Sequence, residues 1–532
     1  MTDREKTAEG SSLGGRREHA LGVAILVNLA IHALAMLAMA TLLLPAMPGG
    51  PTGDDLERAR RIAEAPALFR LGWLPWHLCA LADVWMAVAL ARSREVPRPA
   101  AYATLALTAL AVAPDQAAQL AWVTRGVDLA RAAAATGDVG PYLAFERPAF
   151  ALTASWAAIA YTLGAIGWTA CLRGSGAFSR GLARLSWVVW PWMLAVTVLP
   201  LLPPPLTLPA RATAAGNAIG FVLLEVWLWW AAELVLGRVR PRGPWGRDAA
   251  WRSPVRGPVG AALDFVTNSR VLALALEPLP VTAMKSRIRD VVYVSYLLPA
   301  DRARELVPEG LELDTLGEGG DLALFTFLSF RHHGFGFRFL GPLRRLSPPA
   351  VQTNWRVHVR DPRTGHRGIV FVTNAIDRLF PALGARLFTE GMPMHWLARA
   401  RIDVEPSRAV TMEIDGGVGS GPHVSARLEV AAAGEPWPEP WSRAFADFDA
   451  FLAYCVPQDR AMSTQPWRRR TTRQEIHLGI DPASCVRLVG DVRSPEADAI
   501  AGGGPCVCFL APEVDFTFEA ERYDPWVTAR RA

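Results

Sequence analysis

Lysine is nearly absent from this sequence of 532 residues, in which Lys6 and Lys285 are the only two examples and arginine supplies the remaining positive charge. Enzymes that form a Schiff base with a ketone substrate need a lysine amine in the active site. No lysine follows Lys285 in the chain. The second half of the chain therefore has very little capacity for this type of covalent catalysis.

Cysteine is also scarce, with six residues in the whole chain. They form no Cys-x-x-Cys pair, and no combination with histidine has the spacing of a zinc site. Basic residues do not gather on one soluble domain either, because residues 1–257 carry a net charge of +7 and the remainder a net charge of −2. We therefore expect no metal, no cofactor and no nucleic-acid partner.

Long apolar runs, in contrast, are abundant in the first half. A transmembrane helix needs about 20 mainly apolar residues. Runs near this length are found at 21–44, 71–91, 100–123, 148–172, 185–208 and 212–236. The run 100–123 is the weakest, because Asp115, Gln116 and Gln119 interrupt it. We predict an α-helical transmembrane bundle of about six helices over residues 1–240, with the lipid bilayer as its partner.

The distribution of arginine predicts the orientation of these helices. Positive charge is concentrated at the N-terminus and in the segments that follow the second, fourth and sixth apolar runs, whereas the other loops have few or balanced basic residues. Cytoplasmic loops of membrane proteins carry such an excess of positive charge. We therefore predict a multi-pass protein of a bacterial inner membrane with both termini in the cytoplasm.

Ionisable side chains interrupt the apolar runs at Asp83, Asp115 and Glu225. A charged group at membrane depth is costly, so each of them is a candidate functional residue. One interpretation is a proton or solute path that uses Asp83 and Glu225. The alternative is that these side chains form hydrogen bonds between helices or reach water near a membrane surface.

Residues 241–283 are predicted to be a linker, in which the apolar run 271–279 is too short to cross a bilayer. This segment is expected on the membrane surface or packed under the following domain. From residue 284 the pattern changes to period two: Asn354, Arg356 and His358 alternate with apolar residues, as in a strand with one polar face. The run 507–519 is predicted to be another strand. We predict that 284–532 is a cytosolic, mainly antiparallel, barrel-like or sandwich domain with a few short helices.

Five short motifs follow one another along this half: LLP at 297–299 with LVPEGLELDT at 306–315, NWRVHVR at 354–360, GMPMH at 391–395, QEIH at 474–477 and APEVD at 511–515. With these motifs, residues 284–527 resemble the bacterial YqjF-like domain family, which is related to acetoacetate decarboxylase. The resemblance implies a closed, cone-like β-barrel with an internal pocket. The membrane half resembles no family that we can name.

The decarboxylase relatives use a Gly-x-Pro-Lys-Lys sequence, whose first lysine forms the Schiff base. Met394 and His395 occupy the corresponding positions here, so the resemblance argues against decarboxylase chemistry. His395 remains a candidate acid, base or hydrogen-bond donor, because histidine titrates near neutral pH. Arg356 is a candidate for bidentate binding of a carboxylate. The expected neighbours of these two residues are Asn354, His358 and His477.

Each candidate also has a plainer interpretation. Asn354, Arg356 and His358 can form the solvated outer face of a strand, and His395 can be a buried histidine with satisfied hydrogen bonds. Three functional hypotheses follow. The first is a membrane-anchored protein whose cytosolic barrel binds a small organic acid or ketone without catalysis. The second is an enzyme that uses His395 for acid–base chemistry on a carbonyl or carboxylic substrate, and the third is a proton or small-solute transporter.

Overall fold

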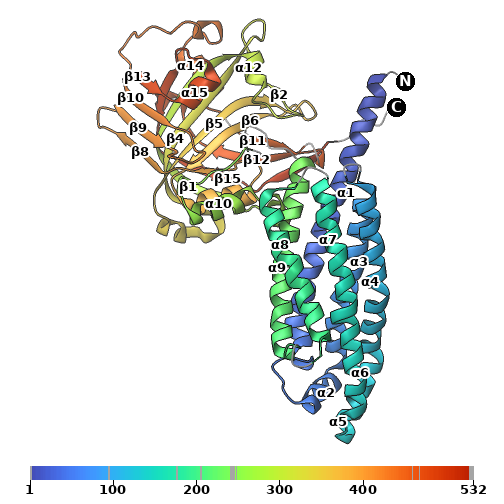
Figure 1. The fold of residues 1–532 in the computed structure, drawn as a ribbon. Coiled ribbons are helices and arrows are strands. Elements are labelled where there is room, and N and C mark those ends of the chain that lie inside the picture. Colours follow the sequence, from blue (N-terminus) through green and yellow to red (C-terminus); the bar gives the residue numbers. More distant parts are fainter. Residues whose placement is uncertain are drawn as a thin grey trace. The chain divides into compact units, whose positions relative to one another are not determined.

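The computed structural model describes residues 3–93, 96–174, 178–203, 207–239, 246, 249–457, 459–465 and 468–526. Contacts within the chain divide it into two compact units, Met1–Arg240 and Pro241–Ala532. The first unit is helical, and the second contains all of the described strands (Figure 1).

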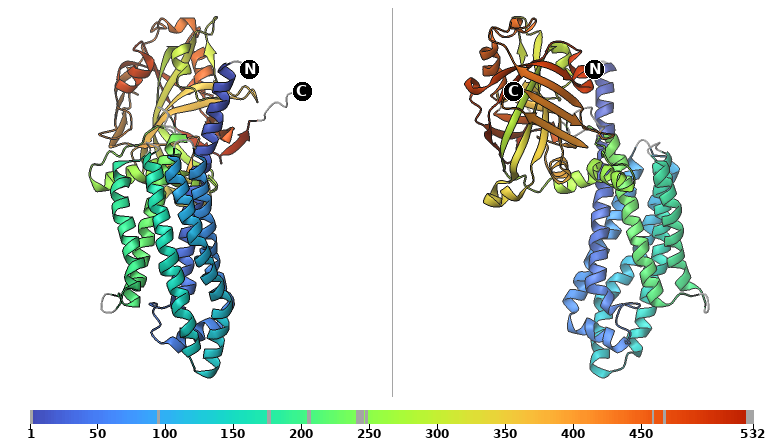
Figure 2. Two further views of the ribbon diagram at one scale, coloured as in Figure 1. Left: turned by 45° about the vertical axis from the view of Figure 1, so that its right-hand side comes forward. Right: turned by 90° about the vertical axis from the view of Figure 1, so that its left-hand side faces the viewer.

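The helices of the first unit run side by side along much of their length (Figure 2). Short π-helical turns at Met39–Leu43, Trp122–Gly126 and Leu152–Ala157 continue three of them. The described α-helices are α1 (Asp3–Ala38), α2 (Asp55–Glu64), α3 (Pro66–Arg92), α4 (Arg98–Ala121), α5 (Val127–Thr136), α6 (Gly140–Ala151), α7 (Ala158–Gly174), α8 (Arg180–Val198) and α9 (Ala210–Val239).

Five helical segments of this unit are long and apolar enough to cross a membrane: His19–Ala46, Pro66–Arg92, Gly140–Gly174, Arg180–Leu201 and Ala210–Arg238. They coincide with five of the six runs predicted from the sequence. The sixth run forms the 24-residue helix α4, which is not among these five. The prediction of a helical region with about six apolar spans is thereby confirmed for five of them, whereas α4 is not apolar enough to be counted with these.

Small residues bring α4 and α7 close together. A Cβ atom added at Gly167 would lie 2.1 Å from Oγ1 of Thr104, and one added at Gly164 would lie 3.0 Å from Oγ1 of Thr108. Glycine at such positions lets two helix backbones approach closely, which is a common mode of packing in membranes. These glycines therefore fix the spacing of the two helices.

A buried ion pair connects the short helix α2 to α6. Arg58 donates from Nη1 to Oε1 of Glu146 at 2.5 Å and from Nη2 to Oε2 at 2.9 Å. The hydroxyl of Tyr142 donates to the same carboxylate at 2.9 Å, and Asp55 accepts a further bond from Arg58 at 2.6 Å. Both charged partners are almost fully buried, so each depends on the other for its stability.

The second unit begins with two short helices, α10 (Pro258–Asn268) and α11 (Arg270–Leu276), which are bent by 56° relative to each other. The guanidinium of Arg386 donates to the carbonyl oxygens of Thr267 and Ala249, at 3.2 and 2.6 Å. The indole of Trp251 donates to the carbonyl oxygen of Met394 at 3.2 Å. The segment predicted as a linker thus packs against the β-rich part; its position at a membrane surface stays a prediction.

Seven strands close into a ring in the second unit, and each is paired with the next. The pairing of β6 with β11 is parallel, and the other six are antiparallel. In ring order the strands are β1 (Met284–Pro299), β4 (Leu322–Phe337), β5 (Ala350–Arg360), β6 (Arg367–Ile376), β11 (Arg460–Gln465), β12 (Arg470–Leu478) and β15 (Val514–Phe518). The predicted barrel is confirmed, and it needs no exposed sheet edge within the ring.

A second set of strands extends from residues 291–295 of β1, the part of that strand that pairs with β14 (Val507–Ala511). In spatial order it contains β14, β13 (Val486–Arg493), β10 (Val424–Val430), β9 (Val410–Asp415) and β8 (Arg399–Val404). The predicted single strand 507–519 is wrong, because the chain leaves β14, passes Pro512 and enters the barrel as β15. Proline has no N–H group to donate to a strand partner.

Short elements complete the second unit. Helix α14 (Phe448–Cys455) contributes Phe451, Leu452 and Cys455 to the core that it shares with barrel strands. The other short α-helices and strands described are α12 (Ala300–Arg304), β2 (Glu312–Leu313), β3 (Thr315–Leu316), α13 (Leu379–Phe388), β7 (His395–Trp396), α15 (Pro495–Ala501) and β16 (Arg522–Pro525).

Candidate functional site

The polar face of β5 points into the barrel. Trp355, Val357 and Val359 belong to the apolar core that includes Met412 and Leu428 of the second set of strands. Side chains alternate along a strand, so the even-numbered residues face the opposite way, toward the ring interior. The exposed fractions of Asn354, Arg356 and His358 are 4%, 0% and 7%. The interpretation of this face as a solvated outer surface is therefore wrong.

Arg356 is a buried cation. Its Nη2 donates to the carbonyl oxygen of Cys455 at 3.1 Å, and its guanidinium carbon lies 5.6 Å from the centre of the Tyr293 ring. Among the described residues, no carboxylate lies within ion-pair distance of Arg356, and its Nε and Nη1 atoms have no hydrogen-bond partner. Burial lowers the pKa of Arg356, but an arginine side chain stays protonated in proteins.

Hydroxyl and thiol groups lie next to this cation. Oγ of Ser295 on β1 and Oγ1 of Thr326 on β4 are 2.9 Å apart. Each lies within 4 Å of the Cys455 sulfur, at 3.9 and 3.8 Å, and Nη2 of Arg356 is also 3.9 Å from that sulfur. Burial raises the pKa of the Cys455 thiol, which is therefore neutral at neutral pH. We call Tyr293, Ser295, Thr326, Arg356 and Cys455 the arginine site.

Four of these five residues, all except Arg356, had no signal in the sequence. Ser295 and Thr326 lie in long strands whose interior face mixes small polar and apolar side chains, so period two does not single them out. Cys455 is 99 residues from Arg356 in the chain. Only the closure of the ring and the position of α14 bring these groups together.

A second polar network lies further along the same face. The two ring nitrogens of His332 are hydrogen-bonded to Ser286 and Gln352, both at 2.8 Å. The Gln352 amide donates to Oδ1 of Asn354 at 2.6 Å. Burial lowers the pKa of His332 to about 4. The predicted residue Asn354 is therefore held in a neutral, largely satisfied hydrogen-bond chain.

His358 lies beyond Arg356 on β5. Its ring stacks on Tyr454 with centroids 4.9 Å apart, and its Nε2 atom has no hydrogen-bond partner among the described residues. Burial, with the nearby cations Arg356 and Arg367, lowers the pKa of His358 to about 3. His358 is therefore neutral, and it adds no second positive charge that would compete with Arg356 for an anion.

The two remaining predicted residues, His395 and His477, make other contacts. Nδ1 of His395 is hydrogen-bonded to Oγ of Ser420 at 2.6 Å, and burial, with Arg386 as a second cause, lowers its pKa to about 3. The His477 side chain is 62% exposed and lies 3.8 Å from Glu519. No described hydrogen bond or ring contact links either histidine to Arg356. Met394, at the position of the relatives' first lysine, is buried in the apolar core.

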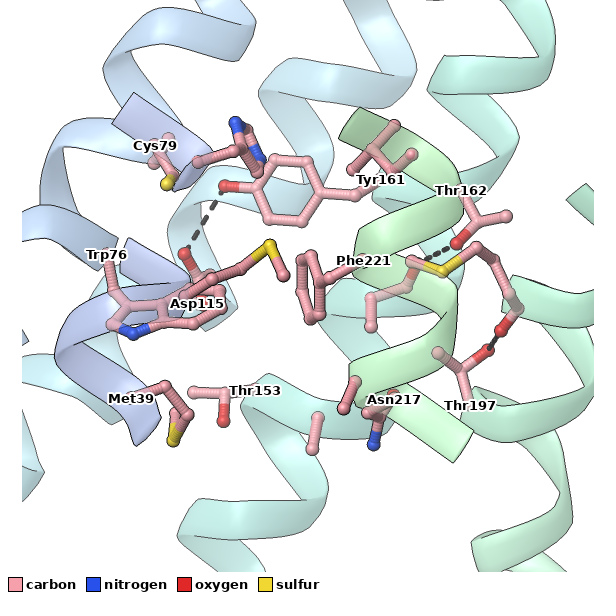
Figure 3. Close-up of a pocket in the computed structure, with 18 of the residues that line it drawn as sticks. Met39, Trp76, Cys79, Asp115, Thr153, Tyr161, Thr162, Thr197, Asn217 and Phe221 are labelled. Carbon is pink, nitrogen blue, oxygen red and sulfur yellow. Dashed lines mark hydrogen bonds between the residues drawn. The ribbon is translucent and has the colours of Figure 1, made fainter. Parts of the chain in front are cut away.

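The first unit contains a cavity of about 380 Å³ (Figure 3). Asp83 and Asp115 line it, whereas Glu225 is not among its lining residues. Asp83 accepts a hydrogen bond from Asn28 at 2.6 Å, and Asp115 accepts one from Gln119 at 2.8 Å. Two of the three predicted membrane-depth acids are therefore brought to one site.

Among the described residues, no group of three or more histidine, cysteine, aspartate and glutamate side chains is arranged to hold a metal ion. The arginine site offers a cation, a thiol and two hydroxyls, and these suit an anion better than a metal.

Comparison with solved structures finds the following distant similarities. "Enduracididine biosynthesis enzyme MppR complexed with pyruvate" is 16% identical, with a TM-score of 0.31, over 46% of this chain and 90% of that one. Acetoacetate decarboxylase from Legionella pneumophila is 12% identical, with a TM-score of 0.32, over 46% and 88%. An acetoacetate decarboxylase-like enzyme from Sphingomonas wittichii RW1 is 9% identical, with a TM-score of 0.32, over 46% and 94%.

No curated protein matches the chain. Residues 285–482 match DUF2071, described as "Uncharacterized conserved protein". This region contains four of the five motifs on which the resemblance to YqjF-like domains rests, and the resemblance is confirmed. Within residues 285–482, the β-rich part of this chain is therefore similar to the DUF2071 family.

Proposed function

We propose that the second unit binds a small organic anion, a carboxylate, inside the barrel at Arg356. One observation carries the proposal: Arg356 is 0% exposed, yet its Nε and Nη1 atoms have no hydrogen-bond partner among the described residues. Buried charges in proteins are normally paired, because removal of a charge from water is costly. An anionic ligand supplies the missing partner.

The chemistry around Arg356 favours a carboxylate. Guanidinium and carboxylate groups match in shape and form paired, charge-assisted hydrogen bonds. The hydroxyls of Ser295 and Thr326 can donate to an additional oxygen of the ligand. The ring of Tyr293, which stacks on Phe509 with centroids 4.2 Å apart, offers an apolar surface to the ligand's carbon skeleton.

We further propose that the first unit anchors this barrel in a membrane. The five long apolar helices support the anchor, and the alternation of arginine-rich loops supports cytoplasmic termini in a bacterial inner membrane. The barrel is then exposed to cytoplasmic metabolites, which include many small carboxylates.

An enzymatic role for His395 is a weaker proposal. A general acid or base works best when its pKa lies near the working pH, whereas the pKa of His395 is about 3. Its hydrogen bond to Ser420 also fits the plainer interpretation of a satisfied buried histidine. The carboxylate proposal does not require His395.

Binding to the purified full-length protein in detergent tests the proposal. We would measure saturation-transfer NMR for short monocarboxylates and for their primary amides, which have nearly the same shape but no charge. Carboxylates should bind and amides should not, and Arg356→Gln should abolish the signal.

The matched control is Arg401→Gln, because Arg401 is an exposed arginine that pairs with Asp403. It should leave carboxylate binding unchanged. Equal binding of amides and carboxylates, or full binding by an Arg356→Gln protein with an unchanged circular dichroism spectrum, would refute the proposal.

A further inference from the structure

The cavity of the first unit has the size and lining of a ligand site. Its volume of about 380 Å³ lies within the range of about 300–1,000 Å³ found for small-molecule pockets. Side chains from α1, α3, α4, α7, α8 and α9 surround it. Figure 3 shows Trp76, Phe221, Met39 and Tyr161 around the space. Most of the lining is therefore apolar or aromatic.

Two acidic side chains face this apolar space. Oδ2 of Asp115 accepts hydrogen bonds from the amides of Gln119 and Gln116 and from the hydroxyl of Tyr161, at 2.8, 3.2 and 3.4 Å. Asp83 lines the same cavity and is bonded to Asn28. Among the described residues that line the cavity, none is a lysine or an arginine.

An acceptor without a partner points to the same kind of ligand. Oε1 of Gln119 has no hydrogen-bond partner among the described residues, although Gln119 is 2% exposed and lines the cavity beside Asp115. A buried acceptor of this kind costs free energy unless a donor reaches it. A ligand that donates hydrogen bonds would therefore satisfy both the acidic groups and this amide oxygen.

The aromatic lining suits a positive charge as well as an apolar body. Trp73, Trp76, Tyr161, Trp168, Trp190 and Phe221 contribute ring surface to the cavity. Cations are attracted to the faces of such rings, and the attraction increases when water is excluded. Aromatic rings also bury large apolar surfaces.

We infer that this cavity binds an apolar molecule that carries a protonated amine, with Asp115 and Asp83 as its counter-charges. The ammonium group donates to Asp115 and to Oε1 of Gln119, and the hydrocarbon part lies among the rings. Acidic groups at membrane depth are costly unless they are paired, and a cationic ligand supplies the pair. This site lies wholly within Met1–Arg240 and is separate from the arginine site of the barrel.

The test uses the purified full-length protein in lipid nanodiscs and the probe 3-phenylpropylamine, with 3-phenyl-1-propanol as the uncharged control of nearly equal size. Because four tryptophans line the cavity, binding can be followed by tryptophan fluorescence. Saturable binding of the amine, and at least tenfold weaker binding of the alcohol, is the expected result.

Variants locate the site. Asp115→Asn should weaken amine binding at least tenfold, and Ala218→Leu should weaken it by filling part of the cavity, which Ala218 lines. The control Asp128→Asn removes an acid whose side chain is 74% exposed, and it should bind like the unaltered protein. Arg356→Gln should also leave amine binding unchanged, so failure of the carboxylate proposal and failure of this one are distinguishable.

Three results would overturn the inference: no saturable amine binding, equal binding of amine and alcohol, or unchanged amine binding by both Asp115→Asn and Ala218→Leu. Ala218→Leu keeps both carboxylates, so loss of binding in this variant cannot be attributed to a missing acidic group in the fold. Proton flux that depends on Asp83 and Asp115 without amine binding would favour a proton path instead.

Discussion

Arg356 on β5 donates a hydrogen bond to the carbonyl oxygen of Cys455, the last residue of α14, at 3.1 Å. This bond connects the barrel strand β5 to α14, the helix that contributes to the core shared with the barrel strands. It satisfies one nitrogen of the guanidinium and leaves Nε and Nη1 without a partner among the described residues. The fold therefore retains a buried positive charge that its own described side chains do not neutralise.

Arg356→Met should make the ligand-free protein more stable. Methionine fills similar space without a charge, and the substitution removes two buried nitrogen atoms that lack hydrogen-bond partners among the described residues, each of which costs about 1–3 kcal/mol. We expect the free energy of unfolding to rise by about 1–3 kcal/mol in denaturant titrations. Carboxylate binding should be lost in the same variant. A clear loss of stability would show that Arg356 serves the fold rather than a ligand.

His395 should make stability depend on pH. Its pKa is about 3 in the folded protein, against about 6.5 in an unfolded chain. Between these values the unfolded state binds a proton that the folded state does not. The contribution of His395 to the free energy of unfolding is therefore complete above a pH of about 6.5. On acidification toward pH 3 this contribution is lost, by about 1.4 kcal/mol per pH unit.

Denaturant unfolding at several pH values, followed by the circular dichroism of the strands, measures this slope. His395→Gln should reduce it, with the buried His332 and His358 supplying the remaining slope, while the control His477→Gln, at a histidine that is 62% exposed, should leave it unchanged. Identical slopes in both variants and in the unaltered protein would contradict the assignment.

Glu146→Gln should destabilise the first unit. It leaves the buried guanidinium of Arg58 without its main carboxylate partner, and such a change costs about 3–5 kcal/mol. The double variant Arg58→Met/Glu146→Gln should recover most of this loss, because no buried charge remains. Thermal unfolding in detergent compares the three proteins. Equal stability of the single and double variants would indicate that the ion pair contributes little.

The glycines between α4 and α7 should resist substitution. Gly167→Ala places a methyl group against Thr104, and overpacking of this kind costs about 1–3 kcal/mol. Gly384 in α13 has no atom within 4 Å of an added Cβ, so Gly384→Ala should stabilise the protein by about 0.5–1 kcal/mol. Thermal unfolding of the two variants gives the comparison. A harmless Gly167→Ala would mean that α4 and α7 are not in close contact.

The sequence predicted the fold class well because its signals are local. Apolar runs of sufficient length revealed five of the helices, and period two on β5 revealed a strand with a polar face. One of the few short helices is α14, which begins at Phe448. Its N-cap, Asp447, accepts a hydrogen bond from the amide of Ala450 at 2.8 Å, so the cap sets the start.

The candidate site was predictable only in part. Arg356 was identified from its type and its place on an alternating strand. Its partners were not, because Ser295, Thr326 and Cys455 meet only when β1, β4 and α14 assemble. The grouping of His395 and His477 with Arg356 came from the family motifs. In the structure, His395 contacts Ser420 and His477 lies near Glu519, and their grouping with Arg356 stays a prediction.

A crystal structure of the protein soaked with 3-bromopropionate tests the central claim most directly, because bromine can be located by anomalous scattering. We predict anomalous density inside the barrel, with a carboxylate oxygen at about 3 Å from Nε or Nη1 of Arg356. Full occupancy of the barrel by protein side chains, with bromine found only outside it, would contradict the account.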